Sequence, residues 1–121
     1  MDCLILQLQK IKALEMSMVL KERYCQTVVD TYPQAISLPP DSAGAILSLV
    51  YNRGPSLALP GSGDPIDRRR EMREIRDDFT QGNIRNIPER LRSMKRLWPN
   101  QRGLRLRRDG EANLIENELS D

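Results

Sequence analysis

Acidic side chains that occur in pairs are the residues of this chain whose type and spacing could do chemistry. Two carboxylates at a suitable separation are sufficient for glycoside hydrolysis, one as the acid and the other as the base or nucleophile. The pairs are Glu71 with Glu74, Asp77 with Asp78, and Glu15 with Glu22. The first two pairs stand among arginines, so we expect them to form ion pairs on a solvated helix face. We therefore assign no catalytic residue.

The other common site chemistries lack the residues they need. The chain has no histidine, so its serines and cysteines have no imidazole base, and an ordinary zinc site is not expected. The segment GSGD at 61–64 follows no predicted strand and lacks the Lys-Ser/Thr pair of a phosphate-binding loop. We expect a flexible loop there, no metal and no cofactor.

Positive charge is concentrated in one block of the sequence. Residues 68–108 hold 14 basic and 5 acidic side chains, whereas residues 109–121 hold 5 acids and no base. An electrostatic partner of this block would be an anion. Nucleic acid is not favoured, because Phe79 and Trp98 fall on hydrophobic stripes and do not alternate with the arginines. A solvated charged face with intrahelical ion pairs is the structural alternative.

The hydrophobic pattern predicts an all-α fold of about five helices packed around a buried central helix. We expect that central helix over residues 41–52, because the run from Ala43 to Tyr51 is uncharged. Asp41 is the predicted N-cap, and Gly54 follows the predicted end. An amphipathic helix is predicted before it, over residues 2–31.

The second half of the chain is predicted to form a loop and three helices. Residues 54–67 hold three glycines, three prolines and two aspartates, which is typical of a surface loop. Helices are predicted over residues 68–80, 87–98 and 101–119, the second with Asn86 as its N-cap. The core residues expected from the last helix are Leu104, Leu114, Ile115 and Leu119.

Four segments in this order resemble a known family. They are AILSLVYNRG (45–54), RREMREI (69–75), IPERLRSMKRLW (87–98) and GLRLRRDGEANLI (103–115). Together they resemble the C-terminal helical lobe of the phage-type lysozymes, the muramidases of the T-even phage class. The resemblance covers residues 13–119 of what we expect to be a single domain, with residues 1–12 as an extension. It implies contact with the glycan strands of peptidoglycan.

The resemblance also implies which residues contact the glycan. The Asn-Arg-Gly end of the central helix faces the glycan cleft in the family, which here implies Tyr51, Asn52 and Arg53. An arginine of the last helix holds the catalytic glutamate there, which implies Arg108, with Arg107 as the alternative. Structural roles stay open as well: Tyr51 in the core, Asn52 at a helix end, and Arg108 paired with Glu111 or Glu116.

The segments that resemble the family do not include its catalytic residues. Those catalytic residues lie near the N-terminus on a small β-hairpin lobe, whereas residues 1–12 contain no glutamate. Arg108 is therefore expected to lack that catalytic glutamate as a partner, and the chain is expected to contact glycan without hydrolysing it. Self-association through exposed cleft surface is expected too. The alternatives are a basic helical module that binds a polyanion or a partner protein, and residual hydrolysis through Glu15 or Glu22.

The sequence also gives expectations about the compartment. No run of about 18 apolar residues occurs, so no membrane span is predicted. Charged residues interrupt the first 20 positions, which is unlike a secretory signal. Cys3 and Cys25 would lie about 33 Å apart on one helix, too far for a disulfide. We expect synthesis in the cytoplasm, with action at the cell wall.

Overall fold

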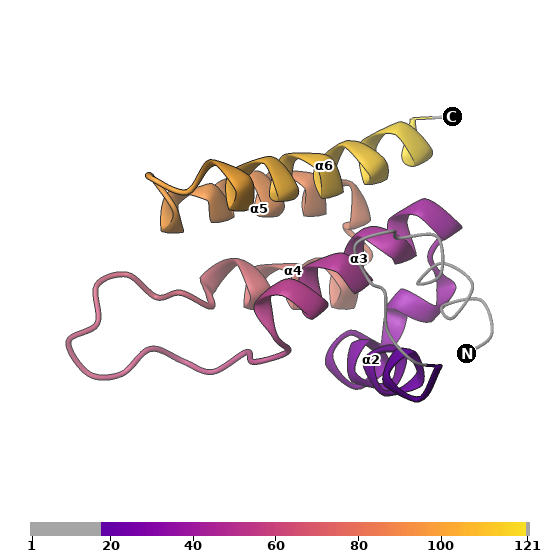
Figure 1. Ribbon diagram of the computed structural model, residues 1–121, viewed down its shortest axis with the longest axis horizontal. Coiled ribbons are helices and arrows are strands. Elements are labelled where there is room, and N and C mark those ends of the chain that lie inside the picture. Colours follow the sequence, from indigo (N-terminus) through magenta and orange to yellow (C-terminus); the bar gives the residue numbers. More distant parts are fainter. Residues whose placement is uncertain (1–17, 121) are drawn as a thin grey trace.

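The computed structural model describes residues 18–120, with side chains from Arg23 onward, and these residues form helices and loops. Five α-helices, three 3-10 helices and no strand occur in this range, which confirms the predicted all-α fold. Figure 1 shows α5 and α6 side by side in one layer, with α2, α3 and α4 beneath them. One hydrophobic core joins the described helices.

Helix α2, Met18–Thr31, is the described part of the helix predicted over residues 2–31; the remainder lies outside the described residues. Cys25 and Val28 are fully buried, as their helical spacing predicts. Tyr32, which follows the helix, is also buried, and its hydroxyl donates a hydrogen bond of 2.9 Å to the backbone carbonyl of Met72. This bond ties the end of α2 to α4. The 3-10 helix η1, Pro33–Ser37, then leads to α3.

Helix α3, Pro40–Arg53, is the buried helix predicted from the uncharged run, with one more residue at each end. Its buried residues are Ser42, Ala43, Gly44, Ala45, Ile46, Leu47, Leu49 and Val50. It packs against both α2 and α6, which agrees with its predicted central place. Gly54 follows with φ +81°, and its backbone N–H donates to the carbonyl of Val50 at 2.8 Å. That positive φ explains the glycine at this position.

The predicted N-cap of α3 is wrong. Asp41 lies inside the helix, and the position before the helix is Pro39, which makes no side-chain cap. Glu118 of α6 caps the helix instead, accepting hydrogen bonds from the backbone N–H groups of Asp41 at 3.0 Å and Ser42 at 2.7 Å. The cap therefore comes from a residue 77 positions away, which a local sequence pattern does not reveal.

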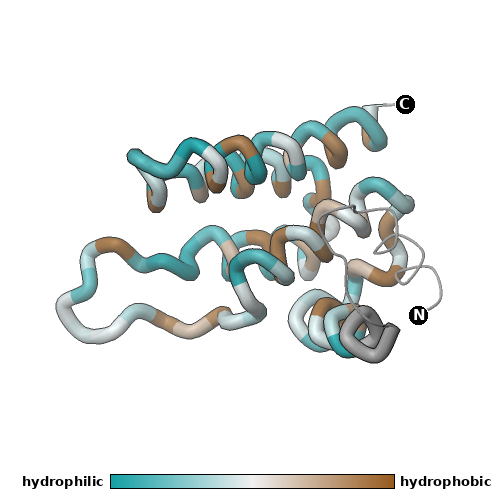
Figure 2. Tube along the Cα trace, in the orientation of Figure 1, coloured by the Kyte–Doolittle hydropathy of each residue, from teal (hydrophilic) through white to brown (hydrophobic). Residues whose placement is uncertain are grey.

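Helix α4, Arg70–Gln81, follows the predicted loop and presents Met72, Ile75 and Phe79 to the core, as predicted. Gly82, in the left-handed region with φ +75°, ends it. The loop before it extends beyond the helices in Figure 1. Figure 2 shows hydrophobic residues on this loop, and Leu59 is indeed 79% exposed.

The helix predicted over residues 87–98 is shorter and irregular. It consists of α5, Ile87–Ser93, and the 3-10 helix η3, Met94–Leu97. Asn86 occupies the predicted N-cap position of α5, but it also ends the preceding 3-10 helix η2, Ile84–Asn86, and its side chain makes no capping hydrogen bond. Trp98 is buried, as predicted.

Helix α6, Arg102–Leu119, packs along both α5 and α3. Of its predicted core residues, Ile115 is buried and Leu104 and Leu119 are partly buried, but Leu114 is 43% exposed. The buried residues of α6 are Arg108, Glu111, Ala112 and Ile115. The face that α6 turns inward is thus partly charged, which the hydrophobic pattern did not predict. No helix within residues 18–120 has the length and hydrophobicity to cross a membrane.

Candidate functional site

Polar side chains of α3 and α6 meet inside the protein at the C-terminal half of α3. Ser48 and Asn52 lie four residues apart and therefore share one face of α3. The Nη1 of Arg108 donates to the Oδ1 of Asn52 at 2.9 Å, and the hydroxyl of Ser48 donates to the Oε2 of Glu111 at 2.6 Å. These hydrogen bonds fix α3 and α6 relative to each other at this point.

Arg108 and Glu111 form a buried ion pair within this network. Nε of Arg108 lies 2.6 Å from Oε1 of Glu111, and Nη2 donates to Oε2 at 2.7 Å. The exposed fraction is 0% for Arg108 and 3% for Glu111. Arg108 therefore has a carboxylate partner on its own helix, as the structural alternative predicted. Of the two partners left open it has Glu111, whereas Glu116 pairs with Arg92 at 2.6 Å.

Burial opposes both charges of this pair. It raises the pKa of Glu111, against the opposing effects of Arg108 and the Ser48 hydroxyl. It also lowers the pKa of Arg108, although Glu111 opposes that shift. A pair of this kind makes the removal of one partner costly, because the other charge stays buried without compensation.

Arg53 lies over the indole of Trp98, where it joins a group of guanidinium groups. Its Cζ is 5.0 Å from the centre of the Trp98 ring, and that of Arg108 is 5.8 Å away. Burial, followed by the positive charges of Arg69, Arg108 and Arg68, lowers the pKa of Arg53 to about 10. The end of α3 is thus electropositive, and Arg53 remains charged at neutral pH.

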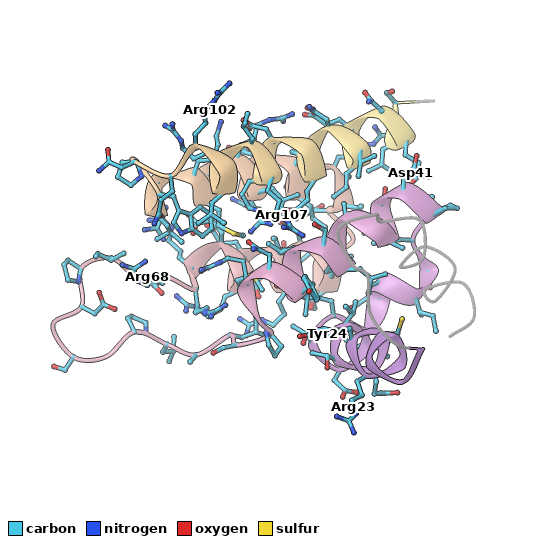
Figure 3. The ribbon with its side chains drawn as sticks, viewed as in Figure 1. Arg23, Tyr24, Asp41, Arg68, Arg102 and Arg107 are labelled. Carbon is cyan, nitrogen blue, oxygen red and sulfur yellow. The ribbon has the colours of Figure 1, made fainter. Side chains whose placement is uncertain are left out.

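Tyr51 and Arg107 complete the residues that the resemblance implies. The ring of Tyr51 packs on that of Tyr24 from α2, with 5.0 Å between the ring centres, and both are half-buried. Arg107 extends into the space between α6 and α3, where its Nε makes a long hydrogen bond of 3.4 Å to the Ser48 hydroxyl (Figure 3). Tyr51 is therefore partly core and partly surface.

The structure brings four of the five implied residues together. Asn52 contacts Arg108 directly, Arg53 and Arg108 share the Trp98 ring, and Arg107 reaches the same network through Ser48. Tyr51 instead faces α2. The sequence reasoning did not assign Ser48 to the site. A single hydroxyl one turn before Asn52 in an apolar helix is the signal that could have revealed it.

The carboxylate pairs considered for chemistry are held by arginines of other elements. Glu71 is fully buried and accepts hydrogen bonds from Nε of Arg96 at 2.8 Å and from the Ser93 hydroxyl at 3.0 Å. Burial alone would raise the pKa of Glu71, but the hydrogen bonds from Arg96 and Ser93 outweigh it and lower that pKa. Asp78 likewise accepts from Nε of Arg90 at 3.0 Å.

The remaining candidate carboxylates do not form a described site either. Glu74 lies 3.6 Å from Arg90, and Asp77 pairs with its neighbour Arg76 at 3.2 Å. Glu15 lies outside the described residues, as does the side chain of Glu22. Among residues 18–120, no group of three or more His, Cys, Asp or Glu side chains is placed to hold a metal ion.

Comparison of the chain with protein-family models, with curated proteins and with solved structures finds no match.

Proposed function

We propose that the chain acts as a lysozyme-like helical lobe that binds the glycan strands of peptidoglycan. The binding surface in this proposal is formed by Tyr51, Asn52 and Arg53 at the end of α3 and by Arg107 of α6. Arg108 supports that surface from beneath, through its hydrogen bond to Asn52. The proposal assigns binding to these residues and no catalytic role.

The proposal rests on contacts between residues of the four segments that resemble the lysozyme family. Asn52 of segment 45–54 accepts a hydrogen bond from Arg108 of segment 103–115, which lies 56 positions away. Trp98 of segment 87–98 lies beneath Arg53. Segment 69–75 contributes Glu71, which pairs with Arg96. Such contacts are what the resemblance implies for segments of one scaffold, and they support the proposal.

The chemistry of the surface suits an acidic glycan. Peptidoglycan presents ring faces, hydroxyl groups and carboxylates. The half-buried guanidinium groups of Arg53 and Arg107 can donate in parallel to hydroxyl and carboxylate oxygens. The positive charge that lowers the pKa of Arg53 would be partly relieved by such an anion. The ring pair of Tyr51 and Tyr24 offers a partly exposed aromatic face at the same end of α3, on the side that faces α2.

Hydrolysis is not part of the proposal, because the described carboxylates near this surface are engaged. A general acid must reach the leaving oxygen and hold a proton there. Glu71 is fully buried with a lowered pKa, and Glu111 is 3% exposed and paired with Arg108. Neither carboxylate is placed for that role.

Co-sedimentation with purified peptidoglycan sacculi tests the proposal. The chain should sediment in a saturable way, and Arg53→Gln/Arg107→Gln should raise the apparent Kd about tenfold by removing charge-assisted hydrogen bonds. Arg85→Gln/Arg102→Gln is the matched control, because it removes two arginines that form no ion pair with a described residue and lie outside the proposed surface. Circular dichroism checks that each variant folds. Absence of sedimentation, or equal losses in both double variants, would contradict the proposal.

A basic interaction module for a polyanion is the second candidate, and one observation favours it. Of the 14 basic side chains in residues 68–108, eight form ion pairs with described carboxylates, which leaves six without one. Most of these pairs join different elements, unlike the predicted intrahelical pairs. Binding to nucleic acid that falls steeply with salt, without binding to sacculi, would favour this candidate.

Self-association through the same surface remains a prediction. Light scattering after size exclusion measures the mass directly, and Tyr51→Arg should shift a dimer towards monomer if the end of α3 forms the interface. A monomer at all concentrations would contradict it.

A further inference from the structure

A cationic pocket lies between η3 and the first half of α6. Its volume is about 460 Å³, and its lining residues are Lys95, Arg96, Arg102, Arg105, Leu106 and Asp109. Four of these six side chains are basic and one is acidic. The volume is within the range of pockets that hold small ligands. None of these residues belongs to the glycan surface proposed above.

Two of the four basic side chains are already committed to other groups. The guanidinium of Arg96 donates to Glu71 and to backbone carbonyls of the loop, among them that of Ile66 at 2.6 Å. The Nζ of Lys95 lies 2.9 Å from the Oδ1 of Asp109. Arg96 thus has four of its five N–H donors engaged, whereas Lys95 shares one carboxylate.

Arg102 and Arg105 are the two that remain. Neither side chain forms an ion pair or a hydrogen bond with any described residue. They stand three residues apart, so they lie on one side of α6 with Cβ atoms about 5–6 Å apart. Their two positive charges repel each other, and an anion bound between them would relieve that repulsion.

The start of α6 adds to the positive potential of the pocket. The residue before the helix, Gln101, makes no capping hydrogen bond, and the first turn contains no acidic residue. The backbone N–H groups of that turn therefore carry an uncompensated partial positive charge.

We propose that this pocket binds a compact polyphosphate group, such as pyrophosphate or the phosphates of a nucleotide. Arg102 and Arg105 donate to its oxygens, because the planar guanidinium fork matches phosphate geometry and a doubly charged anion compensates both. Lys95 also lines the wall, where Asp109 partly compensates its charge. An extended nucleic acid fits less well, because no aromatic side chain lines the pocket to stack on a base.

The pocket and the glycan surface use different sides of α6. Figure 3 shows Arg102 on the outer side of the helix, whereas Arg107 lies between α6 and α3. Arg102 and Arg105 can therefore be changed without touching Arg107. Loss of phosphate binding and loss of glycan binding are separable results.

Isothermal titration calorimetry of the full chain with pyrophosphate at low ionic strength tests the pocket. We expect one saturable site per chain and an increase in Kd of at least about tenfold in Arg102→Gln/Arg105→Gln. The control Arg68→Gln/Arg85→Gln has the same change in net charge and should alter Kd less than about twofold. Thermal unfolding followed by circular dichroism checks that both double variants fold. Arg102→Gln/Arg105→Gln should still bind sacculi.

Titrations with ADP and with a single-stranded oligonucleotide distinguish a nucleotide, a free polyphosphate and a nucleic acid as the ligand. A tighter Kd for ADP than for pyrophosphate identifies a nucleotide, and an equal Kd identifies the polyphosphate group itself; either result supports the proposal. Absence of a saturable site overturns it, as do equal losses in the two double variants. A single-stranded oligonucleotide that binds more tightly than pyrophosphate, and is weakened equally in both variants, also overturns it.

Discussion

Glu118, near the end of α6, caps the start of α3 by accepting the backbone N–H of Ser42 at 2.7 Å. The second carboxylate oxygen accepts the N–H of Asp41 at 3.0 Å. Both donors belong to the first turn of a helix whose own preceding residue, Pro39, offers no cap. The last helix of the chain thus satisfies backbone groups of the central one, so the two elements stabilise each other.

Replacing this capping carboxylate should destabilise the protein. We expect Glu118→Ala to lower the free energy of unfolding by about 1 kcal/mol, the usual cost of losing a helix cap. Asn117→Ala, an exposed neighbour on the same helix, should change it by less than about 0.5 kcal/mol. Urea unfolding followed by circular dichroism measures both. Equal effects of the two substitutions would contradict the capping role.

The contribution of Glu118 should also depend on pH. Burial alone would raise the pKa of Glu118, but the hydrogen bonds from Asp41 and Ser42 outweigh it and lower that pKa below 4.5. A carboxyl whose pKa is lower in the folded state stabilises the protein above its unfolded pKa. The difference between wild type and Glu118→Ala should therefore be complete at pH 7 and shrink as the pH falls below about 4. A difference that stays constant to pH 3 would contradict it.

The buried pair Arg108–Glu111 should show strong non-additivity. Arg108→Met leaves Glu111 buried without a charge partner, which costs about 3–5 kcal/mol. The double variant Arg108→Met/Glu111→Leu removes both charges and should be less destabilised than Arg108→Met alone. Urea unfolding of the two single variants and the double variant completes the cycle. Losses that simply add would contradict a coupled pair.

Acid should partly rescue the single variant. Burial already raises the pKa of Glu111, and Arg108→Met removes the charge that opposes this shift. A carboxyl whose pKa is raised in the folded state stabilises the protein increasingly as the pH falls. The deficit of Arg108→Met relative to Arg108→Met/Glu111→Leu should therefore be smaller at pH 5 than at pH 7.

The hydrophobic pattern predicted most elements of the fold, because those elements depend on local spacing. The uncharged run predicted that α3 is buried. The helical spacing of Met72, Ile75 and Phe79 predicted the buried face of α4. The pattern failed for Leu114, which is exposed, because α6 turns Arg108 and Glu111 inward. Charged residues are buried only when paired, and the sequence does not show which pairs the packing permits.

The resemblance implies the residues of the candidate site but not the contacts that they make. Asn52, Arg53 and Arg108 followed from the resemblance, and the structure brings them together. Ser48 contacts Glu111 because of the way α3 and α6 cross. The spacing of residues within one helix does not predict that crossing. The cap expected at Asp41 failed for a related reason, because a carboxylate from a distant segment occupies that helix start. Asn86 holds its predicted N-cap position, but its side chain makes no capping hydrogen bond.

Arg96 should control how tightly the loop over residues 54–69 is held. Its guanidinium donates to the carbonyls of Ile66 at 2.6 Å and Asp67 at 2.7 Å, while Nε holds Glu71 at 2.8 Å. Arg96→Gln removes these bonds, because the shorter side chain does not reach the loop. Hydrogen bonds to a charged group are worth about 1.5–3 kcal/mol each, so the loop should open at least about tenfold more often.

Limited proteolysis measures this opening. An elastase-type protease that cleaves after small and aliphatic residues should cut Arg96→Gln after Leu57 and Ala58 at least about tenfold faster than wild type, because cleavage follows the population of the open form. Arg102→Gln is the matched control, since Arg102 lines the same pocket but makes no contact with the loop. Mass spectrometry locates the cuts. Cleavage within α3 that rises as fast as cleavage in the loop would indicate global unfolding and contradict a local clamp.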